Sequence, residues 1–241
     1  MHLLPPCLLA LALALSPAAL AGPHADFGRL PLLFEENRGA FDPSVRYVAR
    51  APGSTLFLTG DAAVLALDGP EGRRAAVFTR FVGARTAPPI VGVEAAITRV
   101  HRYRGNDPSG WFEDVPTFRR VRVESLWDGI DLELYDRGGA LEYDFVVAPG
   151  ADPSRVRMRF DGIDGMSVRG DGALVLATPF GELTHSAPIL YQETVAGRTP
   201  VTGRFVATGA AEVGFAVDAY DEARPLVIDP VLVFAPPKRA A

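Results

Sequence analysis

The chain contains very little cysteine. Among its 241 residues only Cys7 is a cysteine, and it lies within an apolar run at the N-terminus. Residues 1–21 are typical of a secretory signal peptide, with a small-x-small site at 19–21 that places cleavage before Gly22. Cleavage would leave no disulfide, no thiol nucleophile and no cysteine metal site. We therefore expect stability to come from side-chain packing and β-sheet hydrogen bonds.

An excess of positive charge is also missing. The 24 basic and 29 acidic residues give a net charge of -5 and a pI near 5.4. Nucleic-acid-binding proteins need a basic surface, so we expect no nucleic-acid partner. No apolar segment after residue 21 is long enough to span a bilayer. The sequence predicts an exported protein of the periplasm, cell surface or extracellular space, without a transmembrane segment in the mature chain.

Signatures of catalysis and metal binding are absent as well. No G-x-S-x-G motif marks a nucleophilic serine. His24, His101 and His185 have no second His or Cys at ligand spacing. The Asp-Gly-rich segment 161–172 lacks the order of acidic residues found in an EF-hand calcium loop. We therefore expect no metal, no cofactor and no enzymatic activity.

The 3.6-residue apolar period of a helix never extends beyond one turn, whereas two-residue alternation is frequent. In residues 141–147 the odd positions are apolar and the even positions are mostly acidic, which predicts a half-buried strand. Asp161-Gly162 and Asp171-Gly172 suit tight turns, and turn signals recur about every ten residues. The pattern predicts an all-β, antiparallel, β-sandwich-like fold with almost no helix.

Domain organisation is less strongly marked. Residues 22–234 are interpreted as one β-rich body, which forms either one large sandwich or two closely packed smaller ones. A turn-rich connection near 105–116 is the candidate internal boundary, and 235–241 is expected to be a loose tail. Residues 84–92, with two consecutive prolines, are interpreted as a loop before a strand at 97–104.

One group of acidic residues could carry chemistry. Asp131, Glu133 and Tyr135 share one face of their predicted strand. If that strand pairs with 141–147 through the turn at 136–139, matching of the apolar faces brings Glu142 and Asp144 to the same side. Four acidic side chains would then lie close together.

Arginines offer a structural explanation for this acidic face. Arg155, Arg157 and Arg159 alternate on the next strand, and Arg120 and Arg122 on the preceding one. We interpret the pattern as an exposed ladder of acids and arginines, because opposed like charges destabilise a sheet unless they are compensated. The alternatives are calcium binding by paired carboxylates and acid-base catalysis of glycoside hydrolysis.

Aromatic side chains form a second candidate site. Trp111, Trp127 and Tyr135, together with Phe112, lie near predicted strand ends and could offer a platform to a sugar. Aromatic rings in such positions also close hydrophobic cores. Both interpretations remain open.

A series of short segments, considered in order, suggests a family. They are 34–39 (FEENRG), 105–108 (GNDP), 128–132 (DGIDL), 141–153, 187–188 (AP) with 191–193 (YQE), and 225–230 (PLVIDP). Their order resembles the uncharacterised N-terminal domain that precedes SBBP-type β-propeller repeats in exported bacterial proteins. The resemblance covers residues 30–232. It implies an extracytoplasmic β-rich domain and no catalytic residues to carry over.

These observations predict an exported, non-catalytic structural or interaction domain at the bacterial cell envelope or outside the cell. Its partner would be an envelope protein, a glycan or a β-propeller domain. One alternative is a carbohydrate-binding or carbohydrate-active protein that uses Asp131, Glu133, Glu142 and Asp144. Another is a docking cap for a β-propeller, which requires an exposed apolar patch or an unpaired edge strand near the C-terminus.

Overall fold

The computed structural model describes residues 31–138 and 140–235. In these residues the only helical segments are single 3-10 turns at Pro70–Gly72, Pro108–Gly110 and Pro153–Arg155. None of them has the length and apolar character needed to cross a membrane. The predicted all-β fold with almost no helix is confirmed. The predicted signal peptide and residues 236–241 of the predicted tail lie outside the described residues.

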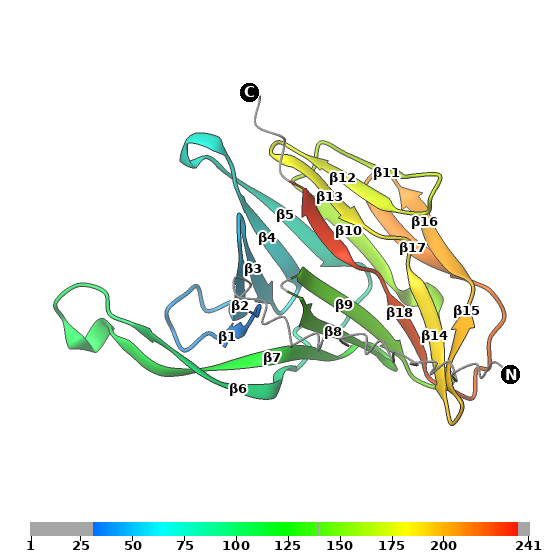
Figure 1. Ribbon diagram of the computed structural model, residues 1–241, viewed down its shortest axis with the longest axis horizontal. Helices are drawn as coiled ribbons and strands as arrows, with labels where there is room; N and C mark the ends of the chain where they lie inside the picture. Colours follow the sequence, from blue (N-terminus) through cyan, green and yellow to red (C-terminus); the bar gives the residue numbers. More distant parts are fainter. Residues whose placement is uncertain (1–30, 139, 236–241) are drawn as a thin grey trace, which may run out of the picture.

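Fifteen antiparallel strands form the larger sheet (Figure 1). In chain order they are β1 (Phe34–Glu36), β2 (Val45–Ala51), β3 (Ser54–Thr59), β4 (Ala62–Asp68), β5 (Arg74–Phe81), β6 (Ile90–Arg102), β7 (Phe112–Trp127), β8 (Ile130–Arg137), β9 (Ala140–Val147), β10 (Arg157–Asp161), β14 (Ile189–Thr194), β15 (Gly197–Val201), β16 (Gly203–Gly209), β17 (Glu212–Val217) and β18 (Leu226–Asp229). Their order in the sheet is β15-β14-β18-β9-β8-β7-β1-β2-β3-β4-β5-β10-β17-β16, and β6 pairs with β7.

The larger sheet curls back on itself. Its first and last strands in the sheet order, β15 and β16, are separated in the chain by Thr202 alone, and they follow one another end to end in Figure 1. The sheet therefore has an inner face around the core and an outer face. Because side chains alternate along a strand, each strand contributes to both faces.

A smaller antiparallel sheet has the order β11 (Gly165–Val168), β12 (Leu174–Thr178), β13 (Gly181–His185) and β19 (Leu232–Ala235). It contacts the larger sheet through the pairs β11 with β16 and β19 with β9. The chain passes from β18 in the larger sheet to β19 in the smaller one through Pro230 and Val231 (Figure 1). This crossover joins the two sheets.

One hydrophobic core lies between the sheets. It contains Leu132 and Phe145 from the larger sheet together with Leu174 and Leu183 from the smaller one. The predicted alternation in 141–147 therefore places its apolar residues inside. A buried polar contact crosses the core, where the Tyr143 hydroxyl lies 2.8 Å from Nδ1 of His185. The structure confirms a sandwich-like arrangement.

The Asp-Gly turns form as predicted. Gly162 and Gly172 have φ angles of 79° and 86°, which glycine adopts without the steric cost that a side chain adds. At Gly162 space is also limited, since a Cβ atom would lie 2.1 Å from the carbonyl oxygen of Ala76. The turn between β10 and β11 therefore requires glycine for two reasons.

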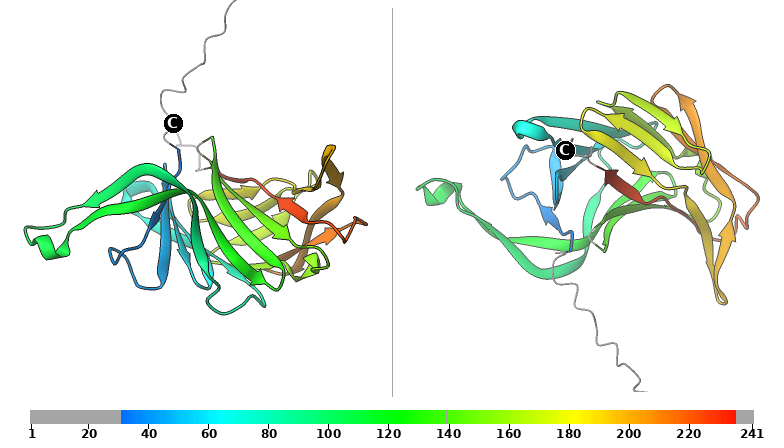
Figure 2. Two further views of the ribbon diagram at one scale, coloured as in Figure 1. Left: turned by 90° about the horizontal axis from the view of Figure 1, so that it is seen from below. Right: turned by 45° about the horizontal axis from the view of Figure 1, so that its top comes forward.

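Strands β6 and β7 are the longest, and their far ends project from the body as an arm (Figures 1 and 2). We define the arm as residues 96–116. The pairing of β6 with β7 shifts in register between Ala95 and Arg99, and Ile97 in this irregular stretch is 99% exposed. Residues 105–116, the candidate boundary, form the end of the arm and the start of β7. The loop predicted for 84–92 is wrong at Ile90–Gly92, where pairing with β7 makes a strand.

Candidate functional site

The predicted acidic face forms on the outer side of the larger sheet. β8 pairs with β9 in the expected register, with Glu133 opposite Asp144 and Tyr135 opposite Glu142. Asp131 continues the same face opposite Val146 and accepts a hydrogen bond from the Ser125 amide over 2.7 Å. The hairpin thus brings all four predicted acids to one side of the sheet.

Two arginines of β7 neutralise Glu133, as predicted. Arg122 lies opposite Glu133 in the register of β7 and β8, and its Nε donates to Oε1 over 2.9 Å. The Arg120 guanidinium donates to the other carboxylate oxygen and also lies 4.8 Å from the centre of the Tyr135 ring. This end of the acidic face is closed by charge pairing.

Arg157 and Arg159 of β10 and Arg155 of the preceding 3-10 turn do not take part, and this prediction is wrong. β10 pairs with β5 and β17, far from β9 in the sheet. Arg155, Arg157 and Arg159 form ion pairs with other acids, namely Asp128, Glu212 and Asp161. The next strand in the sequence is not the next strand in the sheet, because the chain crosses the core after β9.

The strand that does follow β9 in the sheet is β18, and it adds a fifth acid that the sequence interpretation missed. Phe145 pairs with Ile228 and Glu142 with Val231, so the same register places Asp144 opposite Asp229. The alternation of Val227 and Asp229 with the apolar Ile228 was the feature of the sequence that could have placed Asp229 on an outer face. It could not show which strand would be the neighbour.

The acidic face is also less exposed than predicted. Glu133, Glu142, Asp144 and Asp229 are all buried, so the expectation of an exposed ladder is wrong. Arginine side chains and neighbouring rings cover the carboxylates. The face therefore lacks the open access that a polysaccharide substrate would need.

Burial shifts the pKa of two of these carboxyl groups. Burial, followed by the charge of Asp229, raises the pKa of Asp144 to about 7, and the Tyr135 hydroxyl donates to Oδ1 of Asp144 over 3.0 Å. Burial also raises the pKa of Glu142, although Arg137 lies 3.1 Å from its carboxylate. Oδ1 of Asp229 is buried without a hydrogen-bond donor in the described chain. Asp144 and Glu142 therefore hold protons more readily than ordinary acids.

Two of the three aromatic candidates serve the body of the protein. Trp127 is 1% exposed, packs edge-on against Phe81, and donates from Nε1 to the carbonyl oxygen of Val82 over 3.0 Å. Tyr135 lies beneath Arg120 and bonds to Asp144. Trp127 is therefore closed to a ligand, and Tyr135, which lines a small surface cavity with Arg120, is held by its bond to Asp144.

Trp111 has a different environment at the end of the arm. Its ring meets that of Tyr103 edge-on, with centroids 5.2 Å apart, and the His101 ring is nearly parallel to Tyr103 at 6.3 Å. Tyr103 is 60% exposed. We call His101, Tyr103 and Trp111 the aromatic stripe. An open cavity of about 600 Å³ beside it is lined by Trp111, Phe112, Arg38, Arg99 and Asp114, among others.

The other face of the arm is fixed to the body by Glu35. The Glu35 side chain is 4% exposed and accepts hydrogen bonds from Arg102 Nε over 2.8 Å and from Arg50 over 2.9 Å. The Phe41 ring lies 5.0 Å from the Arg102 guanidinium and 5.5 Å from that of Arg50. Burial by itself would raise the pKa of Glu35, but its hydrogen bonds to these arginines lower it. We call Glu35, Arg50, Arg102 and Phe41 the clamp.

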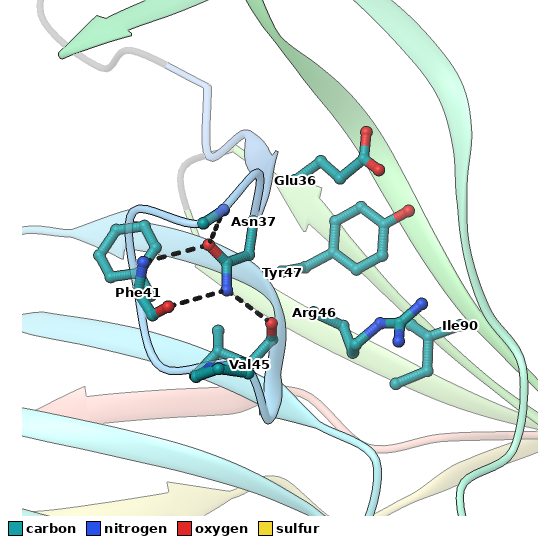
Figure 3. A pocket seen from close by; sticks show the side chains of 9 residues that line it. Glu36, Asn37, Phe41, Val45, Arg46, Tyr47 and Ile90 are labelled. Carbon is teal, nitrogen blue, oxygen red and sulfur yellow. Dashed lines mark hydrogen bonds between the residues drawn. The ribbon is translucent and has the colours of Figure 1, made fainter. Parts of the chain in front are cut away.

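Asn37 folds the loop that supports the clamp (Figure 3). Its Nδ2 donates to the carbonyl oxygens of Asp42 over 3.0 Å and Val45 over 2.9 Å. Its Oδ1 accepts from the amides of Gly39 over 3.0 Å and Phe41 over 3.1 Å. Asn37 thus bonds to both sides of the loop and holds Phe41 in the clamp.

Gly39 provides the surface on which the arm rests. Its φ of 107° favours glycine, and an added Cβ would lie 3.3 Å from the Phe112 ring. On the other side of the loop is an open cavity of about 480 Å³. Glu36, Arg46 and Tyr47 point into it in Figure 3, towards Ile90. The FEENRG segment therefore has a structural role that joins the loop, the clamp and the arm.

The fold and these sites define an all-β domain with two packed sheets, a clamped arm and a covered acidic face. Within residues 31–138 and 140–235, no group of three or more His, Cys, Asp or Glu side chains could hold a metal ion. The chain belongs to the family described as "Domain of unknown function (DUF7948)", which matches residues 34–231. No curated protein and no solved structure matches the chain.

Proposed function

We propose that the protein is an exported, non-catalytic interaction domain that binds a partner protein through its arm. The observation that carries this proposal is the aromatic stripe, which the clamp holds away from the body in a defined position. Rigid presentation reduces the entropy lost on binding, because the binding residues are already ordered. The arm thus has the properties of a preorganised binding element.

The composition of the arm favours a protein over a glycan. Tyr, Trp and Arg are enriched among the residues that contribute most to protein interfaces, and the arm carries Tyr103, Trp111, Arg99 and Arg104. Ile97 adds an apolar side chain that is 99% exposed and therefore open to a partner. The rings of Tyr103 and Trp111 are at 87° to each other, so they do not form a flat platform for sugar rings.

Site-specific photocrosslinking in the producing cells tests this proposal. A photoreactive amino acid at Ile97 or Tyr103 should give the same discrete adduct, and Trp111→Ala should abolish it. The matched control is Val195, which is also a fully exposed apolar residue but lies in the β14–β15 turn. An identical adduct at Val195, or none at either arm position, would contradict binding through the arm.

A glycan array separates this proposal from the carbohydrate alternative. Reproducible binding of the purified protein to one class of saccharide, lost on Trp111→Ala and retained on Ile97→Ser, would favour a glycan ligand. The proposal expects no such binding. Trp127→Phe is a poor test, since that ring is buried in the core.

Export is the second part of the proposal, and it is supported by the apolar segment at residues 1–21. Protein recovered from the periplasm or medium should begin at Gly22 when its N-terminus is measured by mass spectrometry. Deletion of residues 2–21 should retain the chain in the cytoplasm. A full-length N-terminus on exported protein would contradict cleavage.

A docking cap for a β-propeller remains a second candidate because of β19. This strand is the outermost of the smaller sheet and pairs only with β13, so its other edge is unpaired within the described chain. Such an edge can accept an additional strand. Addition of SBBP-type repeats should slow hydrogen exchange at Leu232–Ala235 and leave it unchanged at β15, which is also an edge strand. Equal exchange with and without the repeats would exclude this role.

A further inference from the structure

Two carboxyl groups meet without an arginine where β9 pairs with β18. Asp144 is 7% exposed and Asp229 is 3% exposed, and the register places them directly opposite each other. Opposed residues on neighbouring antiparallel strands have Cβ atoms about 4.5–5.5 Å apart. Two ionised carboxylates at this separation, away from water, would repel each other strongly.

The surrounding charged groups are already engaged. From β8, Glu133 holds Arg120 and Arg122, and from β9, Glu142 lies beside Arg137. From β14, Tyr191 lies near both aspartates, and its ring is covered by Arg198 of β15 at 4.1 Å. Within residues 31–138 and 140–235, no arginine lies within ion-pair distance of Asp144 or Asp229.

One atom of the pair lacks a partner. Oδ1 of Asp229 is buried and accepts no hydrogen bond in the described chain. Buried acceptors nearly always have a donor, because an unpaired one loses its bond to water. Asp144 already accepts a hydrogen bond from the Tyr135 hydroxyl on its own Oδ1. In a protonated Asp144, the proton would be carried by the other oxygen, Oδ2.

We propose that Asp144 and Asp229 form a proton-binding site, in which the protonated carboxyl group of Asp144 donates a hydrogen bond to Oδ1 of Asp229. One proton removes the repulsion between the two groups and supplies the missing donor. This arrangement agrees with the raised pKa of Asp144, which burial and the Asp229 charge bring to about 7. In this proposal the Asp144–Asp229 pair of the acidic face binds one proton.

The site lies at the joint between the two sheets. Asp229 is the last residue of β18, and the chain then crosses through Pro230 and Val231 to β19. Loss of the proton places two like charges between β9 and β18, immediately before this crossover. The crossover and the unpaired edge of β19 therefore become less stable when the pair loses its proton.

The direction of this pH dependence follows from the linkage between proton binding and folding. The folded chain keeps the proton up to a pH of about 7, whereas an unfolded aspartate releases it near pH 4. Between these values only the folded state binds the proton, so the stability it contributes is full at acid pH and is lost as the pH rises. For one proton, the unfolding equilibrium constant changes by up to about tenfold per pH unit in this window.

The test compares the wild type with Asp144→Asn, since asparagine has the shape of a protonated aspartate and keeps both an acceptor and a donor. The ratio of the wild-type unfolding constant to that of the variant should rise by up to about tenfold per unit between about pH 5 and 7, then level off. Asp131→Asn removes an acidic charge from the same face without touching the pair and should not reproduce this rise. A constant ratio for Asp144→Asn across the range would overturn the proposal.

A second measurement does not depend on the folding of a variant. Infrared difference spectra of the wild type should show a protonated carboxyl band that disappears as the pH is raised from about 6 to about 8. Hydrogen exchange, corrected for its intrinsic pH dependence, should accelerate at β18 and β19 over the same range. Absence of the carboxyl band at about pH 5 would also overturn the proposal.

Discussion

Glu35 and Arg102, which are 67 residues apart in the sequence, meet in a charge-assisted hydrogen bond that fixes the arm to the body. Arg102 Nε donates to Oε1 of Glu35 over 2.8 Å, and a second guanidinium nitrogen donates to Oε2. Two donors from one guanidinium define direction as well as distance. The arm is therefore held in orientation, which is the property that the proposed binding function requires.

Removal of the Glu35 charge should loosen the arm. Glu35→Gln leaves Arg102 and Arg50 without a charged partner, and we expect unfolding free energy to fall by about 2–3 kcal/mol. This is somewhat less than the ~3–5 kcal/mol for fully buried pairs, because both arginines are partly exposed. Urea denaturation gives the value. The control is Glu36→Gln, whose exposed pair with Arg38 should contribute about 0–1 kcal/mol. Equal losses in the two variants would contradict the clamp.

The two tryptophans should differ sharply in accessibility. Trp127 is enclosed in the core whereas Trp111 lies in the arm. Iodide should therefore quench Trp111 fluorescence in Trp127→Phe protein much more than it quenches Trp127 fluorescence in Trp111→Phe protein. In stability measurements, Trp127→Ala should cost about 3–5 kcal/mol, as expected for a large buried ring. Similar quenching of both rings would show that the arm packs against the body.

Gly162 and Gly150 form a matched pair for testing backbone constraints. Both have positive φ, but a Cβ at Gly162 would meet the Ala76 carbonyl oxygen at 2.1 Å, whereas none of the structure lies within 4 Å of one at Gly150. Gly150→Ala should therefore cost only the backbone term of about 1 kcal/mol. Gly162→Ala adds a clash and should cost about 2–4 kcal/mol in thermal or urea unfolding. A smaller loss at Gly162 than at Gly150 would contradict the close approach.

His185 should make the protein less stable in acid. Burial lowers the pKa of His185 to about 4, below the value of about 6.5 in an unfolded chain. The buried, neutral His185 therefore makes its full contribution to the free energy of unfolding above a pH of about 6.5. As the pH falls towards about 4, the unfolded chain binds a proton that the folded chain does not, and about 3 kcal/mol of that contribution is lost. The variant His185→Phe/Tyr143→Phe removes both hydrogen-bonding groups and should lose this acid dependence. Urea unfolding of both proteins at several pH values provides the measurement, and parallel pH profiles would exclude the assignment.

The acidic face shows how far the residue pattern could predict the site. The pairing of β8 with β9 and the shared side of Glu133 and Asp144 followed from alternation and a short turn. The partnership of Glu133 with Arg122 followed from the adjacent hairpin. These are local relationships, because a short turn leaves few possible registers. Burial of the face did not follow, since it depends on side chains from several strands at once.

Contacts between strands that are distant in the sequence could not be predicted from the residue pattern. Alternation shows which residues of a strand share a face, but it does not name the neighbouring strand. Arg157 was therefore assigned to the wrong partner, and Asp229 was missed, although each alternates correctly within its own strand. The connection of FEENRG to the arm was missed for the same reason, because Glu35 and Arg102 come together only through the contacts of β1, β6 and β7.

The sequence by itself determined the strands, their two faces and most of their turns, because these depend on backbone dihedral preferences and on the two-residue alternation of side chains. Tertiary structure decided which strands are neighbours, and thereby placed Asp144 opposite Asp229 and Arg102 against Glu35. Strand neighbours are selected by burial of one common core, a property of the whole chain. The clamp and the proton-binding pair exist because of that selection.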